Sequence, residues 1–179
     1  MRMLSRVAER LYWMARYLER TEDVARLTQA YTHLIMDIPE GSEPGWEILV
    51  QILDATPTFG QHHRVYNEQN VLKFLIADSD NPGSIRSSIK SARENVRTTR
   101  DVLPGEAWEQ VNELYLYAEE HAEKSFGRRN RHAFLDQIIS HHGIARPGQR
   151  DTIKAIAVIG YRFAQTAANE HTVYEFHDN

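Results

Sequence analysis

Residues 80–112 carry the side chains whose types and spacing could do chemistry. Four arginines follow one edge of an apolar helical stripe and, at about 100° per residue, lie within roughly 60° of one another. These are Arg86, Arg93, Arg97 and Arg100. Arginines at such a boundary lay their stems over the core and pair with carboxylates, for which Glu9, Glu19 and Glu94 are candidates. The alternative interpretation is that their guanidinium groups hold an anion.

The start of the same segment supports the anion-site interpretation. Asn81 is the expected N-cap, and Pro82 the first helical residue, where its missing N–H costs nothing. Free backbone N–H groups at a helix start attract phosphate or carboxylate groups, and Gly83 and Ser84 would let the backbone and a hydroxyl come close. We predict an anion-binding site made of Asn81, Gly83, Ser84, Arg86, Arg93, Arg97 and Arg100. An ordinary capped helix start is the competing explanation.

A second group of charges lies on the N-terminal segment, where a Glu-Arg dipeptide occurs twice. Glu9-Arg10 and Glu19-Arg20 are ten residues apart, which puts them on adjacent helix faces about 80° apart. Arg16 lies three residues before Glu19, a spacing typical of local ion pairs worth about 0.2–0.5 kcal/mol. The group consists of Glu9, Arg10, Arg16, Glu19, Arg20 and Arg26. It forms a solvated face, a bridge to another helix or an interaction surface, and all three interpretations stay open.

Other chemistries find little support in the sequence. The chain has nine histidines, but the adjacent pairs at 62–63 and 141–142 lie in expected loops and point in different directions. His121, with Glu119, Glu120 and Glu123 around it, does not match the Glu-x-x-His pattern of bundle metal sites. The absence of cysteine excludes disulfides, thiolate metal sites and cysteine nucleophiles. Neither G-x-S-x-G nor a phosphate loop occurs. We therefore expect no metal and no cofactor, and we assign no catalytic residue.

A bundle of helices must position these groups. The segment from Leu4 to about Asp37 is predicted as one long helix, because apolar residues recur at alternating three- and four-residue spacing. The seam comprises Leu4, Val7, Leu11, Met14, Leu18, Thr21 and Ala25, followed by Val24, Leu27, Tyr31, Leu34 and Ile35. Three aromatic residues, Tyr12, Trp13 and Tyr17, flank this seam and are expected at the edge of the core.

The remainder of the chain divides into shorter helices. They are expected over Trp46 to Leu53, Glu68 to Ala77, Asn81 to Val102, Glu106 to about Phe126, His132 to His141 and from Asp151 onward. The third of these carries the stripe Ile85, Ile89, Ala92, Val96 and Leu103. Pro57 and Gly60 are expected to break the chain, and Gly127–Arg131 to form a basic connector. The sequence predicts an all-α, single-domain antiparallel bundle of about six or seven helices.

Composition and charge fit a soluble globular protein of 179 residues, 41% hydrophobic and 26% charged. The net charge of −4 and the pI near 6.1 argue against binding to nucleic acid or an anionic membrane. No run approaches the roughly 20 apolar residues of a membrane span. The N-terminus lacks the apolar core and cleavage site of a signal peptide. We therefore expect a cytoplasmic protein that does not bind nucleic acid or a membrane.

Two motifs in this order resemble the Alpha-E family, a group of bacterial helical proteins named for a Glu-Arg motif. They are the opening MLSRVAERLYWMARYLERTEDVARL and the internal NPGSI…SARENVRTTRD…W…N, within residues 3–120. The matching positions are Glu9, Arg10, Arg16, Glu19, Arg20 and Arg26, then Asn81, Pro82, Ser84, Ile85, Arg93, Glu94, Asn95, Arg97, Arg100, Asp101, Trp108 and Asn112. The resemblance implies an all-α fold, a cytosolic location, and association with a circularly permuted ATP-grasp protein and a transglutaminase-like protease. Such an association suggests a peptide-ligation or peptide-modification system.

The C-terminal part of the chain departs from the family pattern. Members are longer and carry a second Glu-Arg segment, of which residues 159–166 are only a faint echo. The positions equivalent to Arg16, Glu19 and Arg20 hold Tyr161, Ala164 and Gln165. We expect a shortened or diverged member, with a motif-bearing core over 1–126 and divergent C-terminal helices over 127–179. Self-association into a homo-oligomer would then complete the bundle.

The charged residues support three hypotheses for function. In the first, the chain is an interaction or accessory protein that binds an ATP-grasp ligase-type partner through them. In the second, it is an enzyme or catalytic subunit for a carboxylate- or phosphate-bearing substrate; the arginines position the anion, and Glu9 or Glu19 acts as acid or base. In the third, the charges are buried salt bridges, so that Glu19→Ala would cost about 3–5 kcal/mol. The hypotheses differ in whether the charges face solvent or the core.

Overall fold

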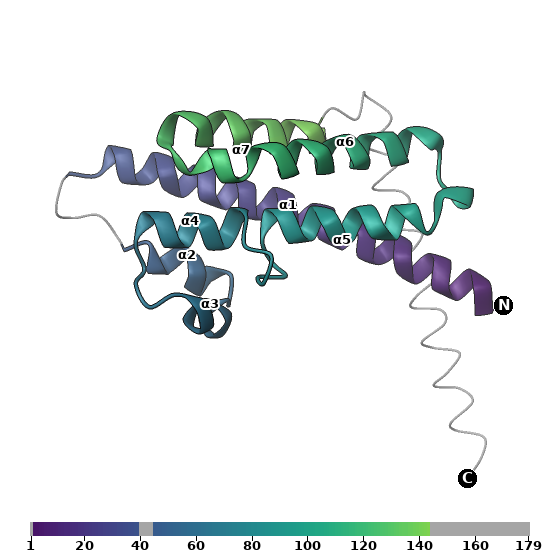
Figure 1. The fold of residues 1–179 in the computed structure, drawn as a ribbon, viewed down its shortest axis with the longest axis horizontal. Coiled ribbons are helices and arrows are strands. Elements are labelled where there is room, and N and C mark those ends of the chain that lie inside the picture. Colours follow the sequence, from purple (N-terminus) through teal and green to yellow (C-terminus); the bar gives the residue numbers. More distant parts are fainter. Residues whose placement is uncertain (1, 40–44, 144–179) are drawn as a thin grey trace, which may run out of the picture.

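The computed structural model describes residues 2–39 and 45–143, which form seven α-helices and two short 3₁₀-helices and contain no strand (Figure 1). The all-α prediction is therefore confirmed. The helix expected from Asp151 onward and the faint Glu-Arg segment at 159–166 lie outside the described residues. The single-domain organisation and the division at residue 126 stay predictions.

Helix α1 spans Arg2–Asp37 and confirms the predicted long helix. Its seam is buried over the middle of the helix, where Met14 and Leu18 reach the core. Thr21 and Thr28 are also buried, and their hydroxyls donate to the carbonyl oxygens four residues earlier, so they need no interhelical partner. Leu34 was expected in the seam but is 47% exposed, because it lies on the same side of the helix as the charged residues.

Three short helices follow: α2 (Glu47–Ile52), α3 (Thr56–His62) and α4 (Glu68–Ile76). Helices α2 and α4 were predicted, but α3 corrects the expectation that Pro57 and Gly60 break the chain. Pro57 lies in the first turn, where a missing N–H costs no hydrogen bond. Phe59 is fully buried against Tyr66 and Phe74, with ring centroids 4.5 and 5.1 Å away. This aromatic packing stabilises a helix that local propensity disfavours.

Helix α5 spans Ile85–Arg97 and is followed by the 3₁₀-helix η1 (Arg100–Val102). Its predicted apolar stripe is buried. The predicted N-cap is wrong, because Ser84 caps the helix by accepting from the N–H of Ser87 at 3.1 Å. Asn81 lies in the preceding turn, where its buried side chain donates to the carbonyl oxygen of Phe74 and accepts from the N–H of Gly83, both at 2.9 Å. The tertiary bond to α4 thus holds Asn81 outside the helix.

The last described elements are α6 (Gly105–His121), η2 (Glu123–Phe126) and α7 (Arg128–Gly143). The predicted basic connector over 127–131 is wrong, since α7 begins at Arg128. Arg131, expected in a solvated loop, is 1% exposed. Its Nη2 donates to Oε1 of Glu68 at 2.7 Å and to the carbonyl oxygen of Phe126 at 2.9 Å. An ion pair with α4 therefore draws this residue into the interior.

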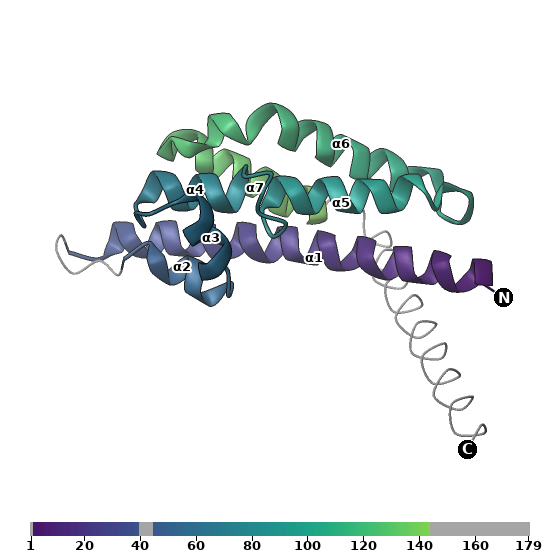
Figure 2. The same cartoon turned by 60° about the horizontal axis from the view of Figure 1, so that its bottom comes forward.

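The helices are arranged antiparallel around α1. Helix α1 packs along α5 and α7, and α6 packs on α5 and also contacts α7. Figures 1 and 2 show α4 and α5 following one another in one row beside α1, with α2 and α3 grouped near the C-terminal end of α1. The core between them contains Leu49, Phe59, Phe74, Leu75, Ile89, Val111, Phe134 and Ile138. Two surfaces of this bundle carry the predicted functional residues: the seam between α5 and α6, and the outer face of α1.

Candidate functional site

The arginine edge of α5 faces α6, and the two helices run in opposite directions. Contacts therefore pair low numbers on α5 with high numbers on α6: Arg86 with Glu119 and Arg93 with Asn112. Arg100 of η1 continues this order with Trp108. The distance along α5 from Arg86 to Arg97 is about 16 Å at 1.5 Å per residue, and Arg100 lies beyond the end of α5, in η1. The four arginines therefore cannot converge on one small anion, contrary to what a single compact anion site would require.

Arg86 forms the most specific contact of this seam. Its Nε donates to Oε1 of Glu119 at 2.7 Å and its Nη2 to Oε2 at 2.8 Å, a bidentate pair, while Nη1 lies 3.4 Å from Oε1 of Glu123. The hydrogen bonds from Arg86 hold the pKa of Glu119 below its ordinary value, although burial opposes this shift. The same hydrogen bonds raise the pKa of Arg86. The guanidinium is thus already occupied by a carboxylate of the protein.

The next arginine along α5 is held by polar and aromatic groups of α6. The Nε of Arg93 donates to Oδ1 of Asn112 at 2.8 Å. Its guanidinium carbon lies 4.6 Å from the ring centroid of Tyr115 and 5.2 Å from that of Trp108. Such stacking is worth about 0.5–1 kcal/mol at exposed sites. Arg100 lies on Trp108 as well, at 4.7 Å.

Of the three carboxylates predicted to pair with this edge, Glu94 does so within the residues that the structure describes. Glu94 pairs with Arg97 at 2.9 Å and with Arg93 at 3.6 Å. Glu19 instead pairs with Arg16 on its own helix. Glu9 makes no ion pair with these arginines within the described part of the chain. The prediction failed for both α1 carboxylates because the arginine edge points toward α6 and away from the outer face of α1.

The predicted helix-start anion site consists of groups that already have protein partners. The N–H groups of Gly83 and Ser84 donate to the side-chain and backbone oxygens of Asn81, at 2.9 and 3.0 Å. The hydroxyl of Ser84 donates to the carbonyl oxygen of Asp78 at 2.7 Å. An anion would have to displace these partly buried hydrogen bonds before it could bind there.

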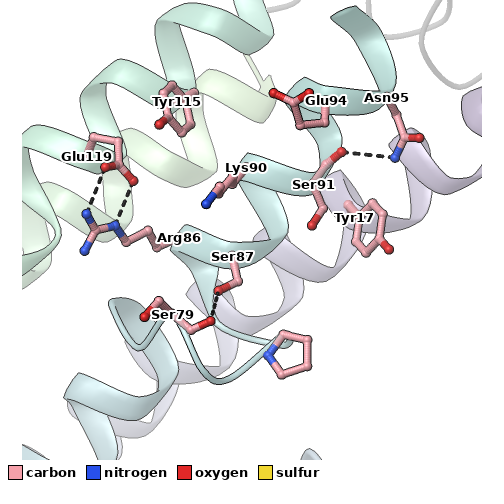
Figure 3. A pocket seen from close by; sticks show the side chains of 11 residues that line it. Tyr17, Ser79, Arg86, Ser87, Lys90, Ser91, Glu94, Asn95, Tyr115 and Glu119 are labelled. Atoms are coloured by element: carbon pink, nitrogen blue, oxygen red, sulfur yellow. Dashed lines mark hydrogen bonds and ion pairs between the residues drawn. The ribbon is translucent and has the colours of Figure 1, made fainter. Parts of the chain in front are cut away.

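A polar groove that sequence reasoning did not identify lies along the outer side of α5. Its volume is about 660 Å³. It is lined by Tyr17 of α1, by Ser79 and Pro82 of the turn, by Arg86, Ser87, Lys90, Ser91, Glu94 and Asn95 of α5, and by Tyr115 and Glu119 of α6. Figure 3 shows Lys90 next to the Arg86–Glu119 pair, with Tyr115 on one side and Tyr17 on the other. The sequence signal was the run SSIKS at 87–91, which puts Ser87, Lys90 and Ser91 on one helix face.

The Glu-Arg residues of α1 face solvent. All six members of the predicted group are exposed, and Arg16 and Glu19 form a 2.9 Å ion pair with side chains 52% and 53% exposed. Arg26 pairs locally with Glu22 at 2.6 Å. Arg10 contacts a second segment, through a 3.4 Å bond from Nη1 to the carbonyl oxygen of Thr98, the residue that follows α5. The hypothesis that these charges are buried salt bridges is therefore wrong.

An aromatic cluster accompanies these charges. Trp13 was expected at the edge of the core, but its side chain is 43% exposed. The ring centroid of Tyr12 lies 5.4 Å away and that of Tyr17 5.9 Å away, so Trp13 is flanked on both sides. Trp13, Glu9, Arg16 and Arg20 fall within about 60° of one another around the helix axis. We call these four residues, together with Glu19 as the ion-pair partner of Arg16, the α1 face.

The described part of the chain was compared with the residue groupings of metal sites and with the length and hydropathy of membrane-spanning helices. No group of three or more histidine, aspartate or glutamate side chains there could hold a metal ion, and the side chains of the histidine pair at 141–142 lie outside it. His121 stacks on Tyr117, with ring centroids 4.4 Å apart, which gives it a packing role. None of the helices described is both long and apolar enough to cross a bilayer.

Comparison with known proteins identifies one family. Residues 3–151 match the model of Alpha-E, described as a predicted alpha-helical domain with a conserved ER motif. Searches of the curated proteins and of the solved structures found no significant match. The two Glu-Arg dipeptides of α1 are the residues of this chain that fit the ER motif in that description.

Proposed function

This chain belongs to the Alpha-E family, and from that premise we propose that it is a helical interaction protein whose α1 face binds a partner of the ATP-grasp ligase type. The partner class is the one that the resemblance to the family implies. The observation that carries the proposal is the exposure of the motif charges around an exposed tryptophan. A family motif that is not needed to hold the core together is available for recognition.

Trp13 has the properties of an interface anchor. Tryptophan is enriched among the few interface residues that supply most of the binding energy. The rings of Tyr12 and Tyr17 flank Trp13 in the free chain, so little side-chain freedom is left to lose on binding. Burial of the exposed part of the indole by a partner would provide the apolar contact that the surrounding charges do not.

The charges around Trp13 supply orientation. Glu9 and Arg20 form no ion pair within the part of the chain that the structure describes. Arg16 forms a solvent-exposed ion pair with Glu19. Rim charges of this kind increase the association rate and select the register of a complex more than they add affinity. The α1 face thus combines an apolar anchor with a rim of both signs, as protein interfaces do.

The enzyme hypothesis has less support. It required free guanidinium groups on α5 and an acid or base on α1. Arg86 and Arg97 are paired with carboxylates of the chain, and Arg93 is held by Asn112 and two aromatic rings. Glu19 is paired on its own helix. A substrate anion would have to compete with each of these contacts.

An affinity capture experiment tests the proposal. The tagged chain is incubated with lysate of its source organism, and bound proteins are identified by mass spectrometry. We expect an ATP-grasp protein with the native chain and its loss with Trp13→Ala and with Glu19→Ala/Arg20→Ala. In a purified complex, Trp13→Ala should weaken binding by about 2 kcal/mol, roughly thirtyfold in Kd.

Matched controls separate recognition from folding. Leu116→Ala removes another exposed apolar side chain, and Glu120→Ala/Lys124→Ala removes an exposed ion pair on the far part of the chain. Both controls should retain the partner, and all variants should unfold at about the same temperature. Retention of the partner by Trp13→Ala and by Glu19→Ala/Arg20→Ala would refute the α1 face as the interface.

A further inference from the structure

The groove on the outer side of α5 has the size and the polar groups of a ligand site. Its volume of about 660 Å³ lies within the range of roughly 300–1,000 Å³ typical of small-molecule sites. Its walls come from α1, the turn before α5, α5 itself and α6, so four separate parts of the chain fix its shape. It does not depend on the helix-start N–H groups, which are bonded within the turn.

Among the described residues that line the groove, one cation lacks an ion-pair partner. Arg86 is held by both oxygens of Glu119, and Glu94 is held by Arg97. Lys90 forms no ion pair within the described residues, although its charge contributes to lowering the pKa of Glu119. Figure 3 shows its side chain beside the Arg86–Glu119 pair inside the ring of lining residues. The ammonium of Lys90 is therefore the group that an anionic ligand would meet.

Neutral polar groups surround this cation. The side-chain hydroxyls of Ser91 and Tyr115 have no hydrogen-bond partner within the described part of the chain and line the groove. Asn95 donates to the carbonyl oxygen of Ser91 at 3.0 Å, which holds its amide in place and leaves its side-chain oxygen as an acceptor. These groups can donate to and accept from the polar atoms of a ligand without any rearrangement of the ion pairs.

We infer that this groove binds a small ligand through a single carboxylate, with Lys90 as the ion-pair partner and Ser91 and Tyr115 as hydrogen-bond donors. A phosphate fits less well for two reasons. Arginine forks bind phosphate bidentately, and the Arg86 fork is taken by Glu119. The carboxylates of Glu94 and Glu119 also line the groove and repel a dianion more strongly than a monoanion.

The ligand site is separate from the α1 face but adjacent to it. Tyr17 lines the groove, and its ring also contacts that of Trp13, with centroids 5.9 Å apart. The inference does not rest on the proposed function, because the isolated chain should bind the carboxylate without any partner protein. A negative affinity capture would leave it standing, and a failed ligand titration would leave the partner proposal standing.

The test is a titration of the full chain followed by amide chemical shifts in NMR. The probe is N-acetylglycylglycine, which carries one free carboxylate, at low ionic strength because salt screens an exposed charge. Its C-terminal amide and inorganic phosphate are titrated in parallel. We expect saturable shifts at residues 87–95 and 115 with the carboxylate probe, and weaker binding of the other two.

Variants decide whether Lys90 is responsible. Lys90→Gln should raise the Kd of the carboxylate probe about tenfold or more, because it removes a charge-assisted hydrogen bond. Lys73→Gln, which removes an exposed lysine on α4, should leave it unchanged. Equal Kd values for Lys90→Gln and the native chain, or no saturable shift at millimolar probe, would overturn the inference. Tighter binding of phosphate than of the carboxylate probe would overturn the choice of ligand.

Discussion

The ion pair between the buried Arg131 and the partly exposed Glu68 offers the most decisive test of the fold. The guanidinium of Arg131 is almost completely buried, and its Nε and Nη1 have no hydrogen-bond acceptor within the described residues. Oε1 of Glu68 lies 2.7 Å from Nη2. The substitution Glu68→Gln keeps the shape and the side-chain oxygen but removes the negative charge. It therefore leaves a buried cation without its counter-charge.

The magnitude follows from the burial of the two partners. Removal of one member of a fully buried pair costs about 3–5 kcal/mol. The side chain of Glu68 is 34% exposed, so water screens part of the interaction, and we expect about 2–3 kcal/mol. For a chain of this size that loss lowers Tm by roughly 4–12 °C. Arg131→Met should cost less, about 1 kcal/mol, because it removes the buried charge and leaves Glu68 partly solvated.

Urea denaturation followed by circular dichroism measures these differences. Glu68 lies in the first turn of α4, where a negative charge also gains about 0.3–1 kcal/mol from the helix dipole. Glu106→Gln, in the first turn of α6 and exposed, is the control for this contribution. A loss for Glu68→Gln no larger than that for Glu106→Gln would refute the reasoning. So would a larger loss for Arg131→Met than for Glu68→Gln.

Three further predictions concern local contacts. Ser84→Ala removes the N-cap of α5 and the bond to the carbonyl oxygen of Asp78, so urea titration should show a loss of about 1–2 kcal/mol; a loss under about 0.3 kcal/mol would contradict the assigned cap. The hydrogen bonds from Arg86 lower the pKa of Glu119 in the folded chain. The pair therefore stabilises the fold by about 1 kcal/mol at pH values above the unfolded-state pKa of Glu119. This contribution disappears as the pH falls through the lowered pKa of the folded state. Glu119→Gln should remove that part of the acid sensitivity, and an unchanged stability–pH profile would argue against the pair. Phe59→Ala should cost about 3–5 kcal/mol in thermal unfolding, and a loss below about 1 kcal/mol would mean that α3 does not pack on α4.

Strong periodicity made the long elements predictable. The stripe from Ile85 to Val96 and the seam through Met14 and Leu18 are buried as expected. A helix with one apolar side can remove that side from water only by packing it against neighbouring helices. The short elements were less predictable. Phe59 holds α3 in spite of Pro57 through contacts with the rings of Tyr66 and Phe74, which lie outside α3, so the local pattern of α3 does not reveal them.

The candidate sites show the same division. The motif charges of α1 and the arginine edge of α5 were identified by residue type and spacing. The ion-pair partner of each charge could not be identified in this way. Arg86 pairs with Glu119 on the neighbouring helix, whereas Glu19 pairs with Arg16 on its own helix. The run SSIKS around Lys90 looks like an ordinary solvated helix face in the sequence, because the walls that turn it into a groove come from α1 and α6.

The sequence by itself determined that this protein is helical, where its long helices run and which family it belongs to, since these depend on the periodicity and order of neighbouring residues. Only the tertiary structure decided that Trp13 and the Glu-Arg charges face solvent, that Arg131 is buried, and that the arginines of α5 are paired. The physical reason is that exposure and ion pairing depend on which helices pack together and at what rotation. The helical wheel of a single segment shows neither the exposure of a residue nor its ion-pair partner.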